Sequence, residues 1–321
     1  MRQARLGWKG WGSLAVGVGV LAGICAVLWA ALWAEMRPNR TLERAVFEGL
    51  YHSPLPRRAT PPSVFHLGHS LVGRDMPAMV AQLTGGVFGS QLGWGASLRQ
   101  HWTGDVPGFA EENASAAFRP AREAILSGDY QAVVLTEMID LADALRHHDS
   151  ARALADWALL ARTSRQDVRL YLYETWHRWD DPAGWAQRVR QDRAALWEDG
   201  LLRPAMAREG VGVIYVIPGG QVMAAVVAAA ESGALPSIGG RAALFSDEIH
   251  LTDLGAYVVA LTQYAVLMGR SPQGLPSDLR RADGTAADLP RDVAALQALV
   301  WTVVQGDPMT GIAGQRDAAG P

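Results

Sequence analysis

Cysteine is nearly absent from this chain, and charge of one sign is scarce. Cys25 is the only cysteine among 321 residues, so the fold contains no intrachain disulfide and no zinc site built on cysteine pairs. The 29 Lys and Arg are scattered and nearly balanced by 32 Asp and Glu, which gives no nucleic-acid-binding footprint. Internal repeats are also lacking. With 49% hydrophobic residues, the chain can bury one full-sized core with extensions.

The longest uncharged run is present near the N-terminus, from Trp11 to Ala34, after three basic residues. Its length suits a bilayer-spanning helix better than the shorter core of a cleaved signal peptide. We therefore predict a cytoplasmic segment at 1–10 and a transmembrane signal anchor at 11–34, with the domain on the outer side of the cytoplasmic membrane. A long cleaved signal is the alternative. Ile24 directly before Cys25 argues against lipidation.

The rest of the chain divides into three parts. Residues 35–62 are predicted as a juxtamembrane linker with a short helix at 41–50 and a proline-rich stretch after it. Residues 63–270 are predicted as one domain. Residues 271–321 are predicted as an extension with a helix at 293–304 and disorder from 306 onward.

Short apolar strands alternate with helical patterns between residues 63 and 270. Strands are predicted at 64–67, 86–92, 132–135, 168–173 and 211–217. Helices are predicted at 76–83, 114–127, 150–163, 181–208, 219–230 and 251–268. This order is typical of a parallel sheet covered on both faces. Right-handed crossovers bring the carboxyl ends of the strands to one edge.

The first of these strands leads to a serine. Its apolar run breaks at Gly68, and Ser70 follows before the helical pattern takes over. A turn between a strand and a helix presents a nucleophile at the carboxyl edge of a sheet. Serine is a poor nucleophile near neutral pH and needs a base. Without one, Ser70 would be interpreted as a helix N-cap.

The candidate base lies in the stretch Asp247-Glu-Ile-His250, just before the last long helix. An aspartate three residues before a histidine can accept the Nδ1 proton and leave Nε2 free to take a proton from serine. The two motifs together favour Ser70 as nucleophile, His250 as base and Asp247 as its orienting carboxylate.

This combination resembles the SGNH (GDSL-like) hydrolases over roughly residues 63–270. The resemblance implies a three-layer α/β/α, flavodoxin-like domain and a Ser70–His250–Asp247 triad that uses no cofactor. It also matches Gly95, in Gly93-Trp-Gly-Ala-Ser97, to a glycine whose backbone N–H helps to bind the oxyanion. The N–H of Ser70 would be a second donor.

One position departs from the family pattern. The asparagine expected after the third strand is replaced by the run Thr136-Glu137-Met138. An ionised Glu137 cannot donate to an oxyanion. Three interpretations stay open: Glu137 is protonated in a dry pocket, it binds a polar group of the substrate, or other donors complete the oxyanion hole.

Further polar and aromatic residues near strand ends are candidates for substrate binding. They are Glu137, Glu174, Trp176 and His101. Indoles can pack on the apolar faces of sugars, whereas the alternative for Trp176 is a place in the core. The histidines fit no zinc spacing, so no metal is predicted.

The sequence thus predicts a membrane-anchored serine esterase. The resemblance implies removal of small acyl groups, above all acetyl, from envelope or extracellular carbohydrate. Two alternatives remain: a carbohydrate O-acyltransferase with the same triad, and a non-catalytic glycan-binding or assembly protein on a degenerate SGNH fold. The predicted partners are an acylated carbohydrate or another small ester and the membrane.

Overall fold

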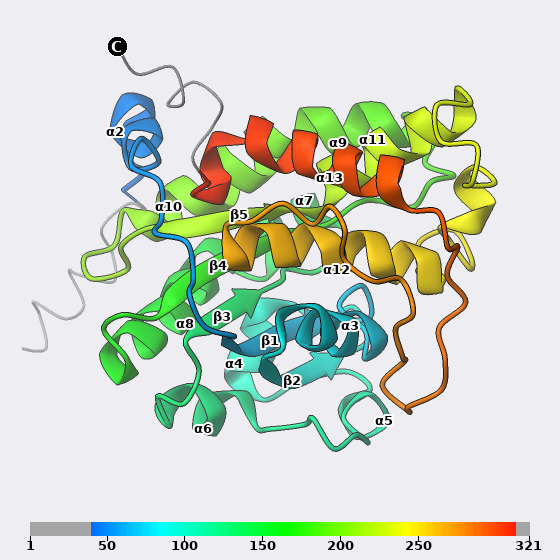
Figure 1. The fold of residues 1–321 in the computed structure, drawn as a ribbon. Coiled ribbons are helices and arrows are strands. Elements are labelled where there is room, and N and C mark those ends of the chain that lie inside the picture. The colour runs from blue at the N-terminus through cyan, green and yellow to red at the C-terminus, as the bar shows by residue number, and fades with distance from the viewer. Residues whose placement is uncertain (1–39, 313–321) are drawn as a thin grey trace, which may run out of the picture. The chain divides into compact units, whose positions relative to one another are not determined.

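A five-stranded parallel sheet forms the centre of the computed structural model, which describes residues 40–312 (Figure 1). The strands are β1 (Ser63–His69), β2 (Val87–Gly93), β3 (Ala132–Leu135), β4 (Arg169–Glu174) and β5 (Ile214–Pro218). Their order is β2-β1-β3-β4-β5, and every neighbouring pair is parallel. This is the flavodoxin-like order. The predicted α/β class and the five predicted strands are confirmed.

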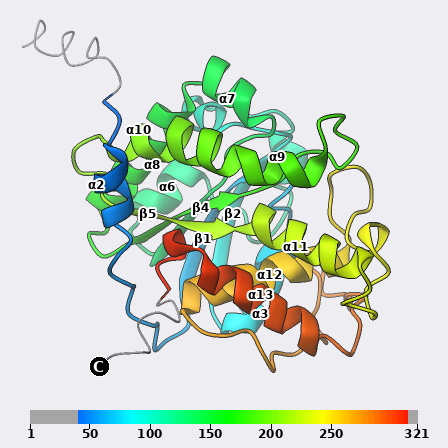
Figure 2. The ribbon, with the colours of Figure 1, turned by 90° about the horizontal axis from the view of Figure 1, so that it is seen from above.

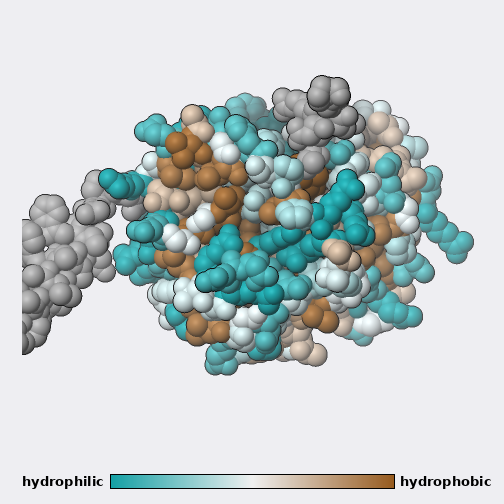
Figure 3. Space-filling model, turned by 60° about the vertical axis from the view of Figure 1, so that its left-hand side comes forward, coloured by the Kyte–Doolittle hydropathy of each residue, from teal (hydrophilic) through white to brown (hydrophobic). Residues whose placement is uncertain are grey.

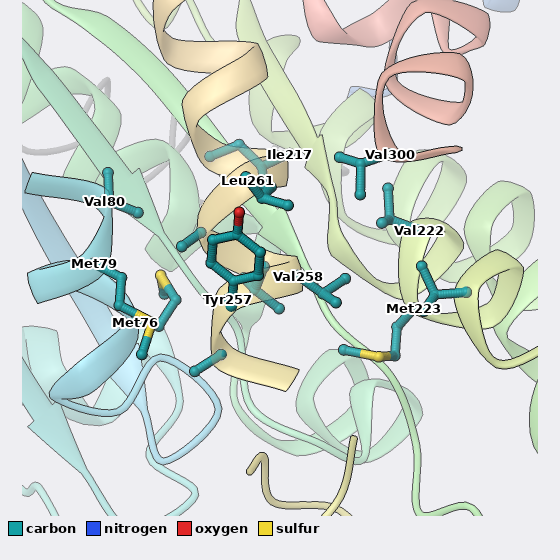
Figure 4. Packing of buried hydrophobic residues seen from close by; sticks show 14 of the residues in the cluster. Met76, Met79, Val80, Ile217, Val222, Met223, Tyr257, Val258, Leu261 and Val300 are labelled. Atoms are coloured by element: carbon teal, nitrogen blue, oxygen red, sulfur yellow. The ribbon is translucent and has the colours of Figure 1, made fainter. Parts of the chain in front are cut away.

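Helices α3, α11, α12 and α13 cover one face of the sheet (Figure 2). Their bounds are α3 (Asp75–Thr84), α11 (Gly219–Glu231), α12 (Asp253–Met268) and α13 (Ala294–Gly306). Almost every residue of α12 is buried, because it packs between α3, α11 and α13 over the sheet. Figure 4 shows Met76 and Met79 of α3 next to Tyr257 of α12.

The opposite face has its own core, because alternate strand residues point to opposite sides. Phe65 and Leu67 of β1 belong to this second core, whereas Val64 belongs to the first. The helices around it are α2 (Arg44–Gly49), α4 (Leu98–Thr103), α6 (Ala121–Leu126), α7 (Leu141–His147), α8 (Ser150–Ser164) and α10 (Arg203–Met206). The remaining helices are α5 (Phe109–Glu112), α9 (Trp185–Asp192), η1 (Arg193–Leu202), η2 (Arg241–Ala243) and η3 (Pro308–Thr310).

Two predicted helices differ from the observed ones. The helix predicted at 114–127 is only α6, which begins after Pro120, because proline disfavours helical geometry in the residue before it. The helix predicted at 181–208 begins later, at Trp185. It runs as α9 (Trp185–Asp192), then as the π-helical segment η1 (Arg193–Leu202), and ends with α10.

The segments on either side of the sheet domain pack onto it. Phe47 of α2 is fully buried in the second core, and the hydroxyl of Tyr51 donates to the carbonyl of Ile214 at 2.8 Å. At the other end, Met309 and Thr310 are buried. The prediction of disorder from 306 onward is therefore wrong for residues 306–312, whose side chains find places against η1 and β5. Residues 313–321 lie outside the described part.

The predicted cytoplasmic segment 1–10 and membrane span 11–34 also lie outside the described residues. Within 40–312, none of the helices has the length and apolar character needed to cross a membrane. Figure 3 shows the side of the domain on which α2 lies, where hydrophobic and hydrophilic residues are interspersed.

Candidate active site

Ser70, His250 and Asp247 form a continuous chain of hydrogen bonds. The Nε2 atom of His250 lies 3.0 Å from the hydroxyl oxygen of Ser70, and its Nδ1 atom lies 2.7 Å from Oδ2 of Asp247. A carboxylate can only accept, so Nδ1 carries the proton and Nε2 is free to accept one from the serine. The structure thus brings together three residues that are up to 180 positions apart in the chain.

Ser70 lies in a tight turn directly after β1. The amide of Val72 donates to the carbonyl of His69 at 2.9 Å, and Gly73 follows with a φ of 59°. Helix α3 begins five residues later, and its N-cap position is occupied by Arg74. The alternative interpretation of Ser70 as an N-cap is therefore wrong: its hydroxyl bonds to His250.

Asp247 is held in place by the backbone of the residues that follow it. Its Oδ1 atom accepts the amides of Ile249 and His250 at 2.8 and 2.7 Å, while Oδ2 faces the imidazole. These hydrogen bonds stabilise the ionised form and lower the pKa of Asp247 to about 2. Asp247 therefore stays ionised at any pH near neutrality, ready to stabilise an imidazolium at His250.

Two tryptophans brace the loop that carries Asp247 and His250. Trp176 Nε1 donates to the carbonyl of Ile249 at 2.9 Å, and Trp179 Nε1 donates to the carbonyl of Asp247 at 2.8 Å. The backbone amide of Trp179 donates to Glu248 at 2.9 Å. Three consecutive carbonyls are thus bound by the segment after β4. Trp179 was missed from the sequence, where only its neighbour Trp176 stood out at a strand end.

The proposed oxyanion donors lie on adjacent loops. Gly95 comes two residues after Gly93, which pairs with His69 in the sheet, so the loops after β1 and β2 start side by side. Gly95 has a φ of 54°, is exposed, and a Cβ placed there would meet nothing within 4 Å. Among the described residues, the amides of Ser70 and Gly95 have no hydrogen-bond acceptor. Both are available to a ligand.

Glu137 is fully buried. Its Oε1 atom accepts the amides of Met138 and Leu98 at 2.8 and 3.2 Å, while Oε2 has no partner among the described residues. Desolvation raises the pKa of Glu137 to about 7. Of the three interpretations left open by the sequence, this environment favours a carboxyl that readily holds a proton in a dry pocket.

Glu174 belongs to a buried ion cluster. It lies 3.6 Å from Arg193, which also contacts Glu198 at 3.2 Å and Asp307 at 2.7 Å. Gln221 donates to Oε1 of Glu174 at 2.7 Å. Burial raises the pKa of Glu174 to about 7, against the opposing effect of Arg193. This glutamate holds β4, η1 and η3 together and has no exposed surface.

The other two residues predicted to bind substrate are also buried. Trp176 is 0% exposed and packs on Phe245 with a ring separation of 5.9 Å. His101 Nε2 bonds to the carbonyl of Gly68 at 2.8 Å, and burial lowers its pKa to about 4, so it is a neutral donor that fixes the end of β1. Glu137, Glu174, Trp176 and His101 are thus all buried and do not form part of the exposed surface at the triad.

The triad lies at an open surface. The side chains of His250 and Asp247 are 45% and 46% exposed. A cavity of about 690 Å³ lies beside the residues that follow His250 in sequence and is lined by Leu251, Thr252 and Arg281. Arg281 is already paired with Asp253 there. Within residues 40–312, no three His, Cys, Asp or Glu side chains gather in a way that could hold a metal ion.

Comparisons with known proteins add little. No family model matches the chain, and no curated protein matches it. Among solved structures, it is similar to a protein described as "a putative SGNH hydrolase from Slackia heliotrinireducens". The two share 20% identity, the alignment covers 64% of this chain and 98% of the other, and the TM-score is 0.39. A likeness as weak as this does not show the activity of the chain.

Proposed function

We propose that this protein is a serine ester hydrolase of the SGNH type, and the observation that carries the proposal is the Ser70–His250–Asp247 hydrogen-bond chain. His250 Nε2 takes the proton of Ser70 as its oxygen attacks the ester carbonyl carbon. The backbone N–H groups of Ser70 and Gly95 bind the oxyanion. His250 then gives its proton to the departing alcohol. Water, deprotonated by His250, releases the acid and restores Ser70.

The open position of the triad supports an ester with a large alcohol part. An exposed His250 leaves room for a bulky leaving group above the serine. We infer an acetylated carbohydrate as substrate. The N-terminal apolar run 11–34 supports a further proposal, that the domain is tethered at the outer side of the cytoplasmic membrane.

The test is active-site labelling of the full-length protein with a fluorophosphonate probe. We expect one adduct, located on Ser70 by mass spectrometry and absent in Ser70→Ala. Hydrolysis of vinyl acetate should fall by about 10⁴-fold or more in the same variant, because the nucleophile is lost. An unlabelled Ser70 in protein shown to be folded would refute the hydrolase and favour a non-catalytic glycan-binding protein.

The acyltransferase alternative is tested by the fate of the acyl group. With vinyl acetate as donor, a hydrolase releases free acetate in the presence of an oligosaccharide. Transfer of most of the acetyl to the sugar would overturn the assignment to hydrolysis while keeping the same three residues in their roles.

A further inference from the structure

An exposed tryptophan, Trp94, immediately precedes the proposed oxyanion glycine and has no part in the mechanism above. Its side chain is 56% exposed, more than any other tryptophan of residues 40–312. An exposed indole that directly precedes a proposed oxyanion donor is well placed to contact a ligand, because its flat apolar face can pack on another ring.

The indole of Trp94 is fixed in place although it is exposed. Its Nε1 atom donates to Oε1 of Glu112 at 3.0 Å, and its backbone amide donates to the carbonyl of Pro107 at 2.8 Å. The ring packs against Gly108, where a Cβ would lie 2.2 to 2.4 Å from three ring atoms. Only glycine permits this approach, so the ring has a defined orientation before any ligand arrives, which reduces the entropy lost on binding.

Trp94 is tied to the turn that carries Ser70. His69 and Gly93 are paired at the carboxyl ends of β1 and β2, neighbouring strands about 4.8 Å apart, so Ser70 and Trp94 are the first residues after two adjacent strand ends. Arg74, four residues after Ser70, donates to the carbonyls of Glu111 and Glu112 in α5. Figure 1 shows α5 beyond the carboxyl end of β2. Gly95, the residue after Trp94, has open space at the position of a Cβ.

We propose that Trp94 is the platform on which the sugar ring of the substrate stacks while its ester lies at Ser70. This proposal rests on the proposed function and names the part of the molecule that recognises the alcohol portion of the ester. The free face of an indole suits the C–H face of a pyranose. Glu111, Glu112 and Arg74 make the surroundings of Trp94 polar, whereas a long acyl chain would require an apolar rim.

The kinetic test compares two acetyl esters in the full-length protein. Glucose pentaacetate has a sugar ring, and vinyl acetate has none. In Trp94→Ala we expect KM for glucose pentaacetate to rise about three- to tenfold, the size of one aromatic contact, with both kinetic constants for vinyl acetate unchanged. Trp94→Phe keeps a ring and should recover most of the loss. Val87→Ala, at the opposite end of β2 and 67% exposed, is the matched control.

An equal rise in KM for both esters, or no rise for either, would overturn the platform. The first result would mean that Trp94 only supports the site, and the second that the sugar binds elsewhere. Labelling of Ser70 in Trp94→Ala, which should remain complete, shows in either case whether the proposed hydrolase itself still stands.

A binding test that needs no turnover uses ¹⁹F NMR of Ser70→Ala labelled with 5-fluorotryptophan. The chain has 12 tryptophans, and the signal of Trp94 is the one that disappears in Trp94→Phe. Titration with glucose pentaacetate should shift this signal first. A shift confined to other signals would overturn the proposal. A shift at Trp94 in a protein whose serine is never labelled would keep the platform and refute the hydrolase.

Discussion

The triad carboxylate and the two strand-end carboxylates have opposite environments. Asp247 is exposed, accepts two amides and a histidine, and has a pKa lowered to about 2. Glu137 and Glu174 are fully buried, and desolvation raises the pKa of each to about 7. The hydrogen-bond partners and the burial of a carboxyl at this edge of the sheet therefore decide whether it is ionised near neutral pH. In the proposed mechanism Asp247 orients His250, whereas the two glutamates belong to the buried framework.

The largest effect should come from Asp247→Asn. An asparagine can present its N–H to the imidazole and favour the wrong tautomer, so that Nε2 no longer accepts the proton of Ser70. We expect kcat for vinyl acetate to fall by about 10³- to 10⁴-fold. The melting temperature should change little, because the side chain lies at the surface. A rate within tenfold of wild type would mean that Asp247 does not orient His250.

The next effect concerns stability and the buried ion cluster. Arg193→Met removes the cation shared by Glu174, Glu198 and Asp307. Three carboxylates are then left without it, and we expect a loss of about 3–5 kcal/mol in the free energy of unfolding by urea. The same exchange at Arg208, whose partner Asp156 lies near the surface, should cost less than about 1 kcal/mol. Equal losses in the free energy of unfolding for Arg193→Met and Arg208→Met would show that the burial of Arg193 does not increase its contribution to stability.

A smaller effect is expected from the brace on the triad loop. Trp179→Phe keeps the ring but removes the N–H that binds the carbonyl of Asp247. We expect kcat to fall about three- to tenfold with KM unchanged. A loop without this hydrogen bond holds His250 less often in the orientation that bonds to Ser70. Trp102→Phe, which changes a partly buried indole on the far side of α4, is the control. A drop in melting temperature without any change in kcat would assign Trp179 a purely structural role.

The effect of Glu137→Gln is of similar size and depends on pH. The carboxyl titrates near 4.5 when unperturbed and at about 7 when folded. Between these values the folded protein binds more protons than the unfolded chain, so its stability falls as pH rises. Glutamine keeps a side-chain oxygen that accepts the amides of Leu98 and Met138. It does not ionise, so the loss of stability at high pH disappears.

We therefore expect Glu137→Gln to be more stable than wild type by about 1–2 kcal/mol at pH 8, and by less at pH 5. Urea unfolding at both pH values measures this. The exposed Glu209→Gln should show no such difference between the two pH values. If Glu137→Gln raised the free energy of unfolding equally at pH 5 and pH 8, the pKa of Glu137 would be the same in the folded and the unfolded protein.

The triad and the sheet could be predicted from the sequence because their signals are local. Asp247 and His250 are three residues apart, and each strand is a short apolar run bounded by turn residues. The surroundings of a side chain at a strand end, in contrast, depend on residues far away in the sequence. Glu174 pairs with Arg193, 19 positions away, and Arg193 pairs with Asp307, 133 positions from Glu174, so the local sequence could not show that this glutamate is buried. Trp94 and Trp179 were missed for the same reason.

Both edges of the sheet are covered, and this has a consequence for solubility. Ser90 of the edge strand β2 exchanges backbone hydrogen bonds with Ala117 and Arg119, and the opposite edge at β5 is bound by Tyr51. Exposed strand edges are where chains join into aggregates. A shortened protein that begins at Ser63 would lose Tyr51 and leave the carbonyl of Ile214 in β5 without this hydrogen bond. Residues 41–62 thus supply one of the contacts at this edge, and η3 supplies others.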